Sequence, residues 1–317
     1  MSFNNDSTVI NIVQVLESDI GIYRLYILYE EGEPLFASGT VMFEPHGSKD
    51  SKACLNSSVA LNCLWLSREG YLWAVDVMGN VYTCANIAFE SAPNIATFAS
   101  GKHHLDWVSG NICTNALTHI SGTTNNDVWV AGTAGLVMHW DGHAWTDHSL
   151  ETQDDIMSLA YDSGELYITT RNGLYHFQGD TWFQIDLSQI NGLDPLIFIP
   201  VCTTFVSSGS LVVCSRHGQI IEGTNKTGFN LIHEADVPWY GVSFFKDALY
   251  LAGGPAGVFR YQDQTLECVK PKGDPVDLSD SENTLYFIPA KQESGPWYFT
   301  FQPDLQSEWK QVAIYLR

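Results

Sequence analysis

The chain has 317 residues, of which 45% are hydrophobic and 13% aromatic, so it can bury a large core and is not a disordered polypeptide. No segment approaches the roughly 18 apolar residues that a membrane-spanning helix requires, and the N-terminus lacks the pattern of a secretory signal. Thirty-six acidic against 15 basic residues give a net charge of −21, which disfavours nucleic acids and anionic membranes and favours a cationic partner.

Seven cysteines are present without the CxxC spacing of a metal or redox motif. Most of them lie in apolar runs, where cysteine acts as a small hydrophobic residue. We therefore expect a reducing compartment, and a cytoplasmic location is the prediction.

A short strand core recurs along the whole chain. Its third residues are separated by 47, 56, 38, 45, 38 and 36 positions, and intervals of about 40 to 50 residues are typical of propeller blades. The seven copies are Arg24–Ile27, Tyr71–Ala74, Asp127–Val130, Glu165–Ile168, Ser210–Val213, Ala248–Leu251 and Thr284–Phe287.

Each copy continues with a turn glycine and then an aromatic or large apolar residue. Glycine supplies the positive φ of tight hairpins, and the later residue is expected to open a fourth strand. The glycines are Gly32, Gly79, Gly135, Gly173, Gly218, Gly257 and Gly295, and the later residues are Phe43, Phe89, Trp145, Trp182, Phe229, Leu266 and Trp309.

These repeats predict a single all-β domain over residues 1–317, a β-propeller of seven four-stranded blades. A six-bladed ring with residues 1–50 as an irregular cap is the alternative. We expect a loop or short helix over Ala85–Gly110. Both ends, Thr8–Val15 and Lys310–Leu316, read as strands, and either could complete the sheet of a neighbouring blade.

The copy at Asp127–Trp145, with its Asp-Val-Trp-Val-Ala-Gly core and later His-Trp-Asp-Gly segment, carries the clearest likeness to known repeats. It resembles bacterial propeller repeats of the Kelch, WD40-like and Asp-box kinds. The resemblance implies the fold without a particular family, because no copy has the complete signature of any one of them.

Ligands of propellers usually meet the loops that enter each inner strand. Those loops are rich in carboxylates with two aromatic residues between them, a pattern that selects cationic partners. The predicted partner-binding residues are Asp154, Asp155, Asp194, Glu234, Asp236, Trp239, Tyr240 and Asp274. Trp239 and Tyr240 could instead begin a buried strand.

Several other sites are weaker alternatives. His139, His143 and His148 span a predicted hairpin, and neither they nor His103 and His104 give a convincing set of three or four zinc ligands. We predict no metal site and no cofactor.

Two further function classes stay open beside binding. A calcium-dependent, lactonase-like hydrolase would place Asn62, Asn115 and Asp162 in the central channel. A carbohydrate-binding propeller would use Trp107, Trp239 and Trp297 to stack on sugar rings.

The sequence favours a non-enzymatic propeller that binds one basic protein, with neither nucleic acid nor membrane as partner. Immunity proteins that neutralise a cognate antibacterial toxin are often acidic, and some look like propellers. This analogy of charge and fold is the basis for predicting an immunity or inhibitor protein, because fold alone does not determine function.

Overall fold

The structure is a computed structural model that describes residues 7–18, 21–30, 38–44, 52–67, 69, 71–84, 107–280, 283–290, 297–303 and 308–313. Strands dominate these ranges, and their helical elements are two short 3-10 turns, η1 (Leu187–Gln189) and η2 (Gly254–Ala256). None of the described helices has the length and apolar character needed to span a bilayer.

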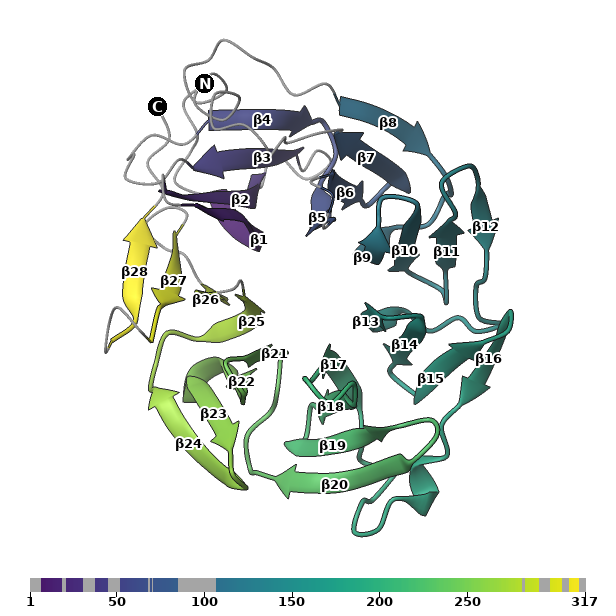
Figure 1. Cartoon of the computed structure of the whole chain (residues 1–317), viewed down its shortest axis with the longest axis vertical. Helices are drawn as coiled ribbons and strands as arrows, with labels where there is room; N and C mark the ends of the chain where they lie inside the picture. Colours follow the sequence, from purple (N-terminus) through teal and green to yellow (C-terminus); the bar gives the residue numbers. More distant parts are fainter. Residues whose placement is uncertain are drawn as a thin grey trace.

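Four-stranded antiparallel sheets follow one another around a central axis, so the chain is a β-propeller (Figure 1). The described residues form seven such sheets, and one of them is built from the N-terminal segment that the six-bladed alternative treated as an irregular cap. For that sheet, blade 1, the structure describes mainly strands and register, whereas most side chains of the other six are described as well.

Each blade consists of four consecutive strands. Blade 1 contains β1 (Ser7–Ser18), β2 (Gly21–Glu30), β3 (Ser38–Glu44) and β4 (Lys52–Ser57). Blade 2 contains β5 (Leu61–Leu66), β6 (Leu72–Asp76), β7 (Asn80–Cys84) and β8 (Trp107–Asn111). Blade 3 contains β9 (Leu117–Thr124), β10 (Asp127–Gly132), β11 (Val137–Trp140) and β12 (Trp145–Asp147).

The other four blades repeat the pattern. Blade 4 contains β13 (Ile156–Asp162), β14 (Glu165–Thr170), β15 (Gly173–Gln178) and β16 (Thr181–Gln184). Blade 5 contains β17 (Pro200–Phe205), β18 (Leu211–Ser215), β19 (Gln219–Thr224) and β20 (Gly228–Glu234). Blade 6 contains β21 (Gly241–Phe245), β22 (Ala248–Ala252), β23 (Val258–Gln262) and β24 (Thr265–Lys270). Blade 7 contains β25 (Pro275–Asp280), β26 (Leu285–Pro289), β27 (Trp297–Phe301) and β28 (Lys310–Ala313).

The first strand of every blade lines the axis, and the inner strands of consecutive blades contact one another (Figure 1). β25 also contacts β1, which closes the ring. The first and last described strands stay within their own blades, with β1 innermost in blade 1 and β28 outermost in blade 7. The idea that an end completes a neighbouring sheet is therefore wrong.

The hydrophobic core lies between the blades. One cluster joins Trp129 and Ala131 of β10 to Leu166 and Ile168 of β14, and similar clusters fill the other described junctions. The second strands are covered by neighbouring blades on both faces, so β6, β18, β22 and β26 are buried at every position. This burial is the reason that the second strand gave the clearest repeat signal in the sequence.

The repeated turn glycine brings two chain segments into contact. Gly218 has φ +91°, and a Cβ added there would lie 1.8 Å from the carbonyl oxygen of Ala235. Its own carbonyl accepts a hydrogen bond of 3.1 Å from the Ala235 amide. The glycine thus supplies positive φ and also lets the loop leaving the blade pack against the turn.

Three sequence predictions need correction. Phe43 lies in β3 and does not open a fourth strand, and the fourth strand of blade 2 begins at Trp107, inside the segment predicted as a loop or helix. Gly173 has no positive φ, although its position in the repeat matches that of Gly218. Gly32, Phe89 and Gly295 lie outside the described residues.

Candidate functional site

The propeller has two faces of loops. We call the upper face the one formed by the loops that enter each inner strand and by the turns between second and third strands. The lower face carries the remaining turns. Hydrogen bonds between the two kinds of upper loop, such as Gly135 N to Asp154 O at 2.7 Å, hold this face together.

The predicted carboxylates on blade 4 are bonded to neighbouring turns. Asp154 Oδ2 accepts a hydrogen bond from Asn172 Nδ2 at 2.7 Å, and Asp155 Oδ1 accepts one from the Ala134 amide at 3.0 Å. Asp155 thereby joins its loop to blade 3, and Asp154 joins it to the β14–β15 turn of blade 4. Part of their hydrogen-bonding capacity is therefore used in holding the loops.

Trp239 is wholly buried and cannot serve as a surface anchor. Its ring packs in the core between blades 5 and 6, and its Nε1 donates a hydrogen bond of 3.0 Å to the carbonyl of Gly218. This corrects its assignment as a partner-binding residue. The adjacent Tyr240 is exposed, with 38% of its surface open to solvent.

Asp194, Asp236 and Tyr240 lie in the loops around the upper end of blade 5 and the entrance to blade 6, and Glu234 is the last residue of β20. The three acids are exposed. Asp274 precedes β25 in blade 7, is half-buried and has φ +48°. The structure thus places four of the predicted residues around blades 5 and 6. The other three carboxylates, Asp154, Asp155 and Asp274, lie on other blades.

The loop over residues 185–199 is the structural centre of this region. Its base is folded into the core, because Ile190, Leu193 and Phe198 are buried in the hydrophobic cluster of blades 4 and 5. Its tip nevertheless exposes Leu196 at 91% and Ile197 at 43%.

Backbone contacts hold the tip in place. Asp194 Oδ1 accepts a hydrogen bond from the Leu196 amide at 3.0 Å, and the Asp194 carbonyl accepts one from the Ile197 amide at 3.3 Å. The ring Nδ1 of His217 lies 2.6 Å from the Ile197 carbonyl oxygen, which fixes Nδ1 as the donor. Leu196 is thus exposed on a loop that core packing holds at its base and hydrogen bonds hold at its tip.

A continuous surface connects this loop to blade 6. Arg216 follows β18 and precedes His217, and its guanidinium carbon lies 6.0 Å from the centre of the Tyr240 ring. We call Leu196, Ile197, Arg216, His217 and Tyr240 the blade 5–6 patch. It combines exposed apolar groups, an aromatic ring and a guanidinium. Asp194 and Asp236 lie in the same loops, and Glu234 ends β20.

Sequence reasoning selected the acids and Tyr240 but missed Leu196 and Ile197. The signal was the apolar run Leu196–Ile199 within a loop longer than its counterparts. Runs of apolar residues in a polar connection mark either a packed loop or an exposed contact surface. In this loop the run does both: Phe198 is buried and packs in the core, whereas Leu196 is exposed.

The lower face carries a different kind of polar site. In blade 3, Asp127 Oδ1 lies 2.8 Å from His139 Nε2, and Asp127 Oδ2 accepts a hydrogen bond of 2.7 Å from the Tyr161 hydroxyl. Burial acts to raise the pKa of Asp127, but hydrogen bonds from Thr123, Tyr161 and His139 outweigh it and lower the pKa. Burial beside this carboxylate raises the pKa of Tyr161 to about 12.

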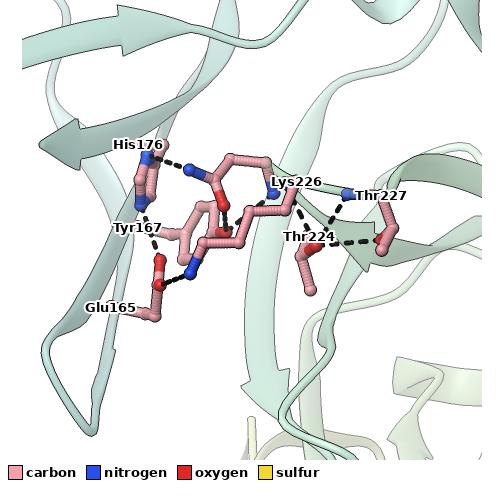
Figure 2. A network of polar contacts seen from close by, with 7 residues as sticks. Glu165, Tyr167, His176, Thr224, Lys226 and Thr227 are labelled. Atoms are coloured by element: carbon pink, nitrogen blue, oxygen red, sulfur yellow. Dashed lines mark hydrogen bonds and ion pairs between the residues drawn. The ribbon is translucent and has the colours of Figure 1, made fainter.

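Blade 4 repeats this arrangement with a different set of residues. Glu165 Oε2 lies 2.8 Å from His176 Nε2, and Glu165 Oε1 accepts an ion-paired hydrogen bond of 2.9 Å from Lys226 Nζ (Figure 2). Lys226 lowers the pKa of Glu165. The aromatic residues Trp129 and Tyr167 pack against the two histidines in equivalent positions.

Several candidate metal and channel residues are hydrogen-bonded to other groups of the protein. His139 is bonded to Asp127, and His143 lies on an exposed turn; within the described ranges no group of three or more metal-ligating side chains occurs. The Asn62 amide donates to the Leu117 carbonyl at 2.6 Å, and the Asn115 amide donates to the Thr133 carbonyl at 3.0 Å. His103 and His104 lie outside the described residues.

The tryptophans of the carbohydrate alternative belong to different blades. Trp239 is buried in the core, whereas Trp107 begins the outermost strand of blade 2 and Trp297 begins β27 of blade 7. Trp239 is therefore not available to stack on a sugar ring.

Comparison with known proteins identifies the fold. No protein-family model matches the chain, and no curated protein matches it in sequence. Among solved structures, YCF48 bound to a D1 peptide aligns with a TM-score of 0.64 at 13% identity, covering 92% of both chains.

Two further structures show the same similarity of fold. The computationally designed protein Ika8 aligns with a TM-score of 0.61 at 10% identity, covering 94% of this chain and 96% of its own. The extracellular domain of the hybrid two-component system BT4673 from B. thetaiotaomicron aligns with a TM-score of 0.57 at 11% identity. That match covers 80% of this chain but only 33% of the larger protein.

Proposed function

We propose that this propeller is a non-enzymatic binding protein that docks one cationic protein partner on the blade 5–6 patch. The observation that carries the proposal is the 91% exposure of Leu196 on a loop whose base is buried in the core. A leucine displayed on a fixed loop exposes apolar area that a partner can cover without first ordering the loop.

The energetics favour an apolar anchor with charged surroundings. Covering a leucine or isoleucine side chain contributes about 1.5–3 kcal/mol, and tyrosine and arginine are common in the residues that dominate binding energy. The net charge of −21 and the nearby Asp194, Glu234 and Asp236 would accelerate encounter with a basic protein.

A distant structural neighbour supports the general idea. The YCF48 structure contains a bound D1 peptide, so a propeller of similar fold holds a polypeptide ligand. At 13% identity this supports a binding role for the fold and gives no information on the partner of this chain.

The more specific proposal is that the partner is an antibacterial toxin and that this chain is its cytoplasmic immunity protein. Its support is the acidic charge and the analogy with acidic, propeller-like immunity proteins. It is tested by expressing the gene of the captured basic partner with and without the propeller. Growth arrest that the propeller relieves supports neutralisation, and a partner that is harmless alone contradicts it.

The binding proposal is tested with three baits: the wild type, the double variant Leu196→Ser with Ile197→Ser, and the control Val108→Ser. Val108 is also an exposed apolar residue but lies on the outer strand β8, and none of the changes alters the net charge. The purified partner should bind the double variant at least about tenfold more weakly, because it loses apolar contacts in the centre of the interface.

The Val108→Ser control should bind as the wild type does. Unchanged affinity of the double variant, with correct folding shown by circular dichroism, would overturn the blade 5–6 patch as the docking surface. Loss of binding by the control alone would place the interface on the outer edge of blade 2.

A further inference from the structure

Two cysteines of blade 5 face each other across neighbouring strands. Cys202 of β17 is the register partner of Cys214 of β18 in the antiparallel ladder that these strands form (Figure 1). Both side chains belong to the hydrophobic cluster between blades 5 and 6, so they point to the same face of the sheet. The structure holds both as thiols. The pair is thus a dithiol in the core beneath the blade 5–6 patch.

The spacing of the two strands suits a disulfide bond. Residues directly opposite each other in an antiparallel pair have Cα atoms about 4.5–5.5 Å apart. A disulfide joins residues whose Cα atoms are roughly 4.4–6.8 Å apart. The ladder also shifts register between Pro200 and Cys202, and the extra residue of such a bulge is unpaired, so β17 can adjust locally. A bond between the two sulfur atoms therefore requires no rearrangement of the sheet.

The two thiols differ in exposure and already influence each other. Burial, and after it the neighbouring thiol of Cys202, raise the pKa of Cys214. Cys214 is fully buried, whereas Cys202 keeps 8% of its surface exposed. An oxidant of about the size of water therefore meets Cys202 first, with the thiol of Cys214 beside it.

This arrangement is specific to blade 5 among the cysteines whose side chains the structure describes. The other cysteines in described strands face apolar partners: Cys63 faces Val75, Cys84 faces Leu72 and Trp107, and Cys268 faces Phe259. Cysteine placed only as a small hydrophobic residue does not need a second cysteine opposite it. The pairing in blade 5 therefore points to chemistry between the two sulfur atoms.

From this placement we infer that Cys202 and Cys214 are a modification site, which hydrogen peroxide converts into a reversible cross-strand disulfide. The Cys202 thiolate attacks one peroxide oxygen and becomes a sulfenic acid, and the other oxygen leaves as hydroxide and is protonated to water. The Cys214 sulfur then attacks the sulfenic sulfur, whose oxygen leaves as a second water molecule. The two thiols lose two electrons and two protons, and one peroxide is reduced to two waters. A dithiol reductant restores both thiols by exchange.

The cross-link reinforces the base of the 185–199 loop. This loop ends where β17 begins, and β18 leads directly into Arg216 and His217. The Arg216 amide donates a hydrogen bond of 2.9 Å to the Ile199 carbonyl, and His217 Nδ1 donates to the Ile197 carbonyl. A covalent bond between the two strands restricts the local opening that breaks these contacts. The oxidised chain therefore holds the blade 5–6 patch more rigidly than the reduced chain does.

The test treats the reduced, folded chain with hydrogen peroxide, removes the peroxide, and blocks the remaining thiols with iodoacetamide in urea. The peroxide dose is raised until the exposed Cys268 is oxidised, because exposed thiols react readily. Peptide mass spectrometry should then find Cys202 joined to Cys214, and dithiothreitol should reverse the link. Oxidation of Cys268 without this link would overturn the inference, as would a link that forms only when the chain is oxidised in urea.

Variants and hydrogen exchange give a matched control. Cys202→Ser should lose the link, and Cys63→Ser should keep it, because Cys63 lies in blade 2. The oxidised wild type should exchange amide hydrogens over residues 197–217 at least about threefold more slowly than the reduced chain, and peroxide-treated Cys202→Ser should not. Equal exchange by the oxidised and reduced wild type would overturn the reinforcement of the loop. No partner protein is present in these measurements, so failure here leaves the proposed protein-binding function untouched.

Discussion

The two faces of this propeller use carboxylates differently. On the upper face, Asp154 and Asp155 accept hydrogen bonds from neighbouring turns, and the surface that stands clear of the loops is apolar at Leu196. On the lower face, Asp127 and Glu165 accept hydrogen bonds and ion pairs from side chains. The number of acidic residues in the loops therefore does not locate a binding surface. Many of these carboxylates are already hydrogen-bonded within the protein, and their bonding partners differ between the two faces.

The two units of the lower face sharpen this contrast. Asp127 is shared by Thr123, His139 and Tyr161, all of which lie in strands. In the unit around Glu165, Phe205 of β17 takes the position that Tyr161 of β13 has beside Asp127, and it has no hydroxyl. Lys226, from the β19–β20 turn, bonds Glu165 instead. The first unit is closed by strand residues, whereas the second includes an exposed lysine side chain from a turn of the next blade.

The largest expected effect concerns Trp239 on the upper side. Trp239→Ala removes a fully buried ring and its hydrogen bond to Gly218, so it should lower the free energy of unfolding by about 3–5 kcal/mol. Denaturant titration measures this loss. Tyr240→Ala, next in sequence but exposed, is the control and should change stability far less. Equal losses for both variants would show that the two residues do not differ in burial as described.

A pH effect of intermediate size is expected at the inner strands. Burial raises the pKa of Asp277 on β25 to about 6 and lowers the pKa of His119 on β9 to about 4. The half-buried aspartate lowers the free energy of unfolding as pH rises from about 4 to 6, because the unfolded chain releases this proton while the folded chain still holds it. The half-buried histidine acts in the opposite direction and lowers the free energy of unfolding as pH falls from about 6.5 to 4, because the unfolded chain binds a proton that the folded chain does not.

The two slopes should largely cancel in the wild type between pH 4 and 6. Asp277→Asn removes one of them, so the variant should be more stable than the wild type near pH 7, by up to about 3 kcal/mol. Its advantage should shrink as pH falls towards 4. Unfolding midpoints measured across this range test the prediction, and a constant difference at every pH would contradict it.

The smallest effect is expected at Asp155. Asp155→Ala removes one exposed hydrogen bond to the Ala134 amide and should lower the free energy of unfolding by about 1 kcal/mol. Glu151→Ala, an exposed acid of the same loop, is the matched control. Thermal unfolding of the two variants compares them directly, and an equal response would mean that Asp155 does not fasten its loop to blade 3.

The second strands and the turns were predictable because they repeat a physical constraint. The strand cores between the blades must be apolar, and Gly218 must lack a side chain where the exit loop meets the turn. The outer strands were less predictable, because they are half-exposed and vary in position. The long connection in blade 2 displaced the fourth strand to Trp107, beyond any regular spacing.

The site was predicted only in part for a related reason. Trp239 and Tyr240 are adjacent aromatic residues in one loop, and their opposite exposure depends on how the loop packs on blade 5. The same applies to Leu196 and Phe198, which lie two residues apart. The pairing of Glu165 with Lys226 joins residues of different blades, a contact that no local sequence pattern encodes.

The most direct test of the docking surface is hydrogen exchange of the chain alone and in complex with its purified basic partner. The proposed function predicts slower exchange in residues 185–199 and 236–240 on partner binding, with little change in the lower turns around Gly164, Asp180 and Lys226. Protection confined to those lower turns would contradict the blade 5–6 patch as the partner-binding surface and would place the interface on the opposite face of the ring.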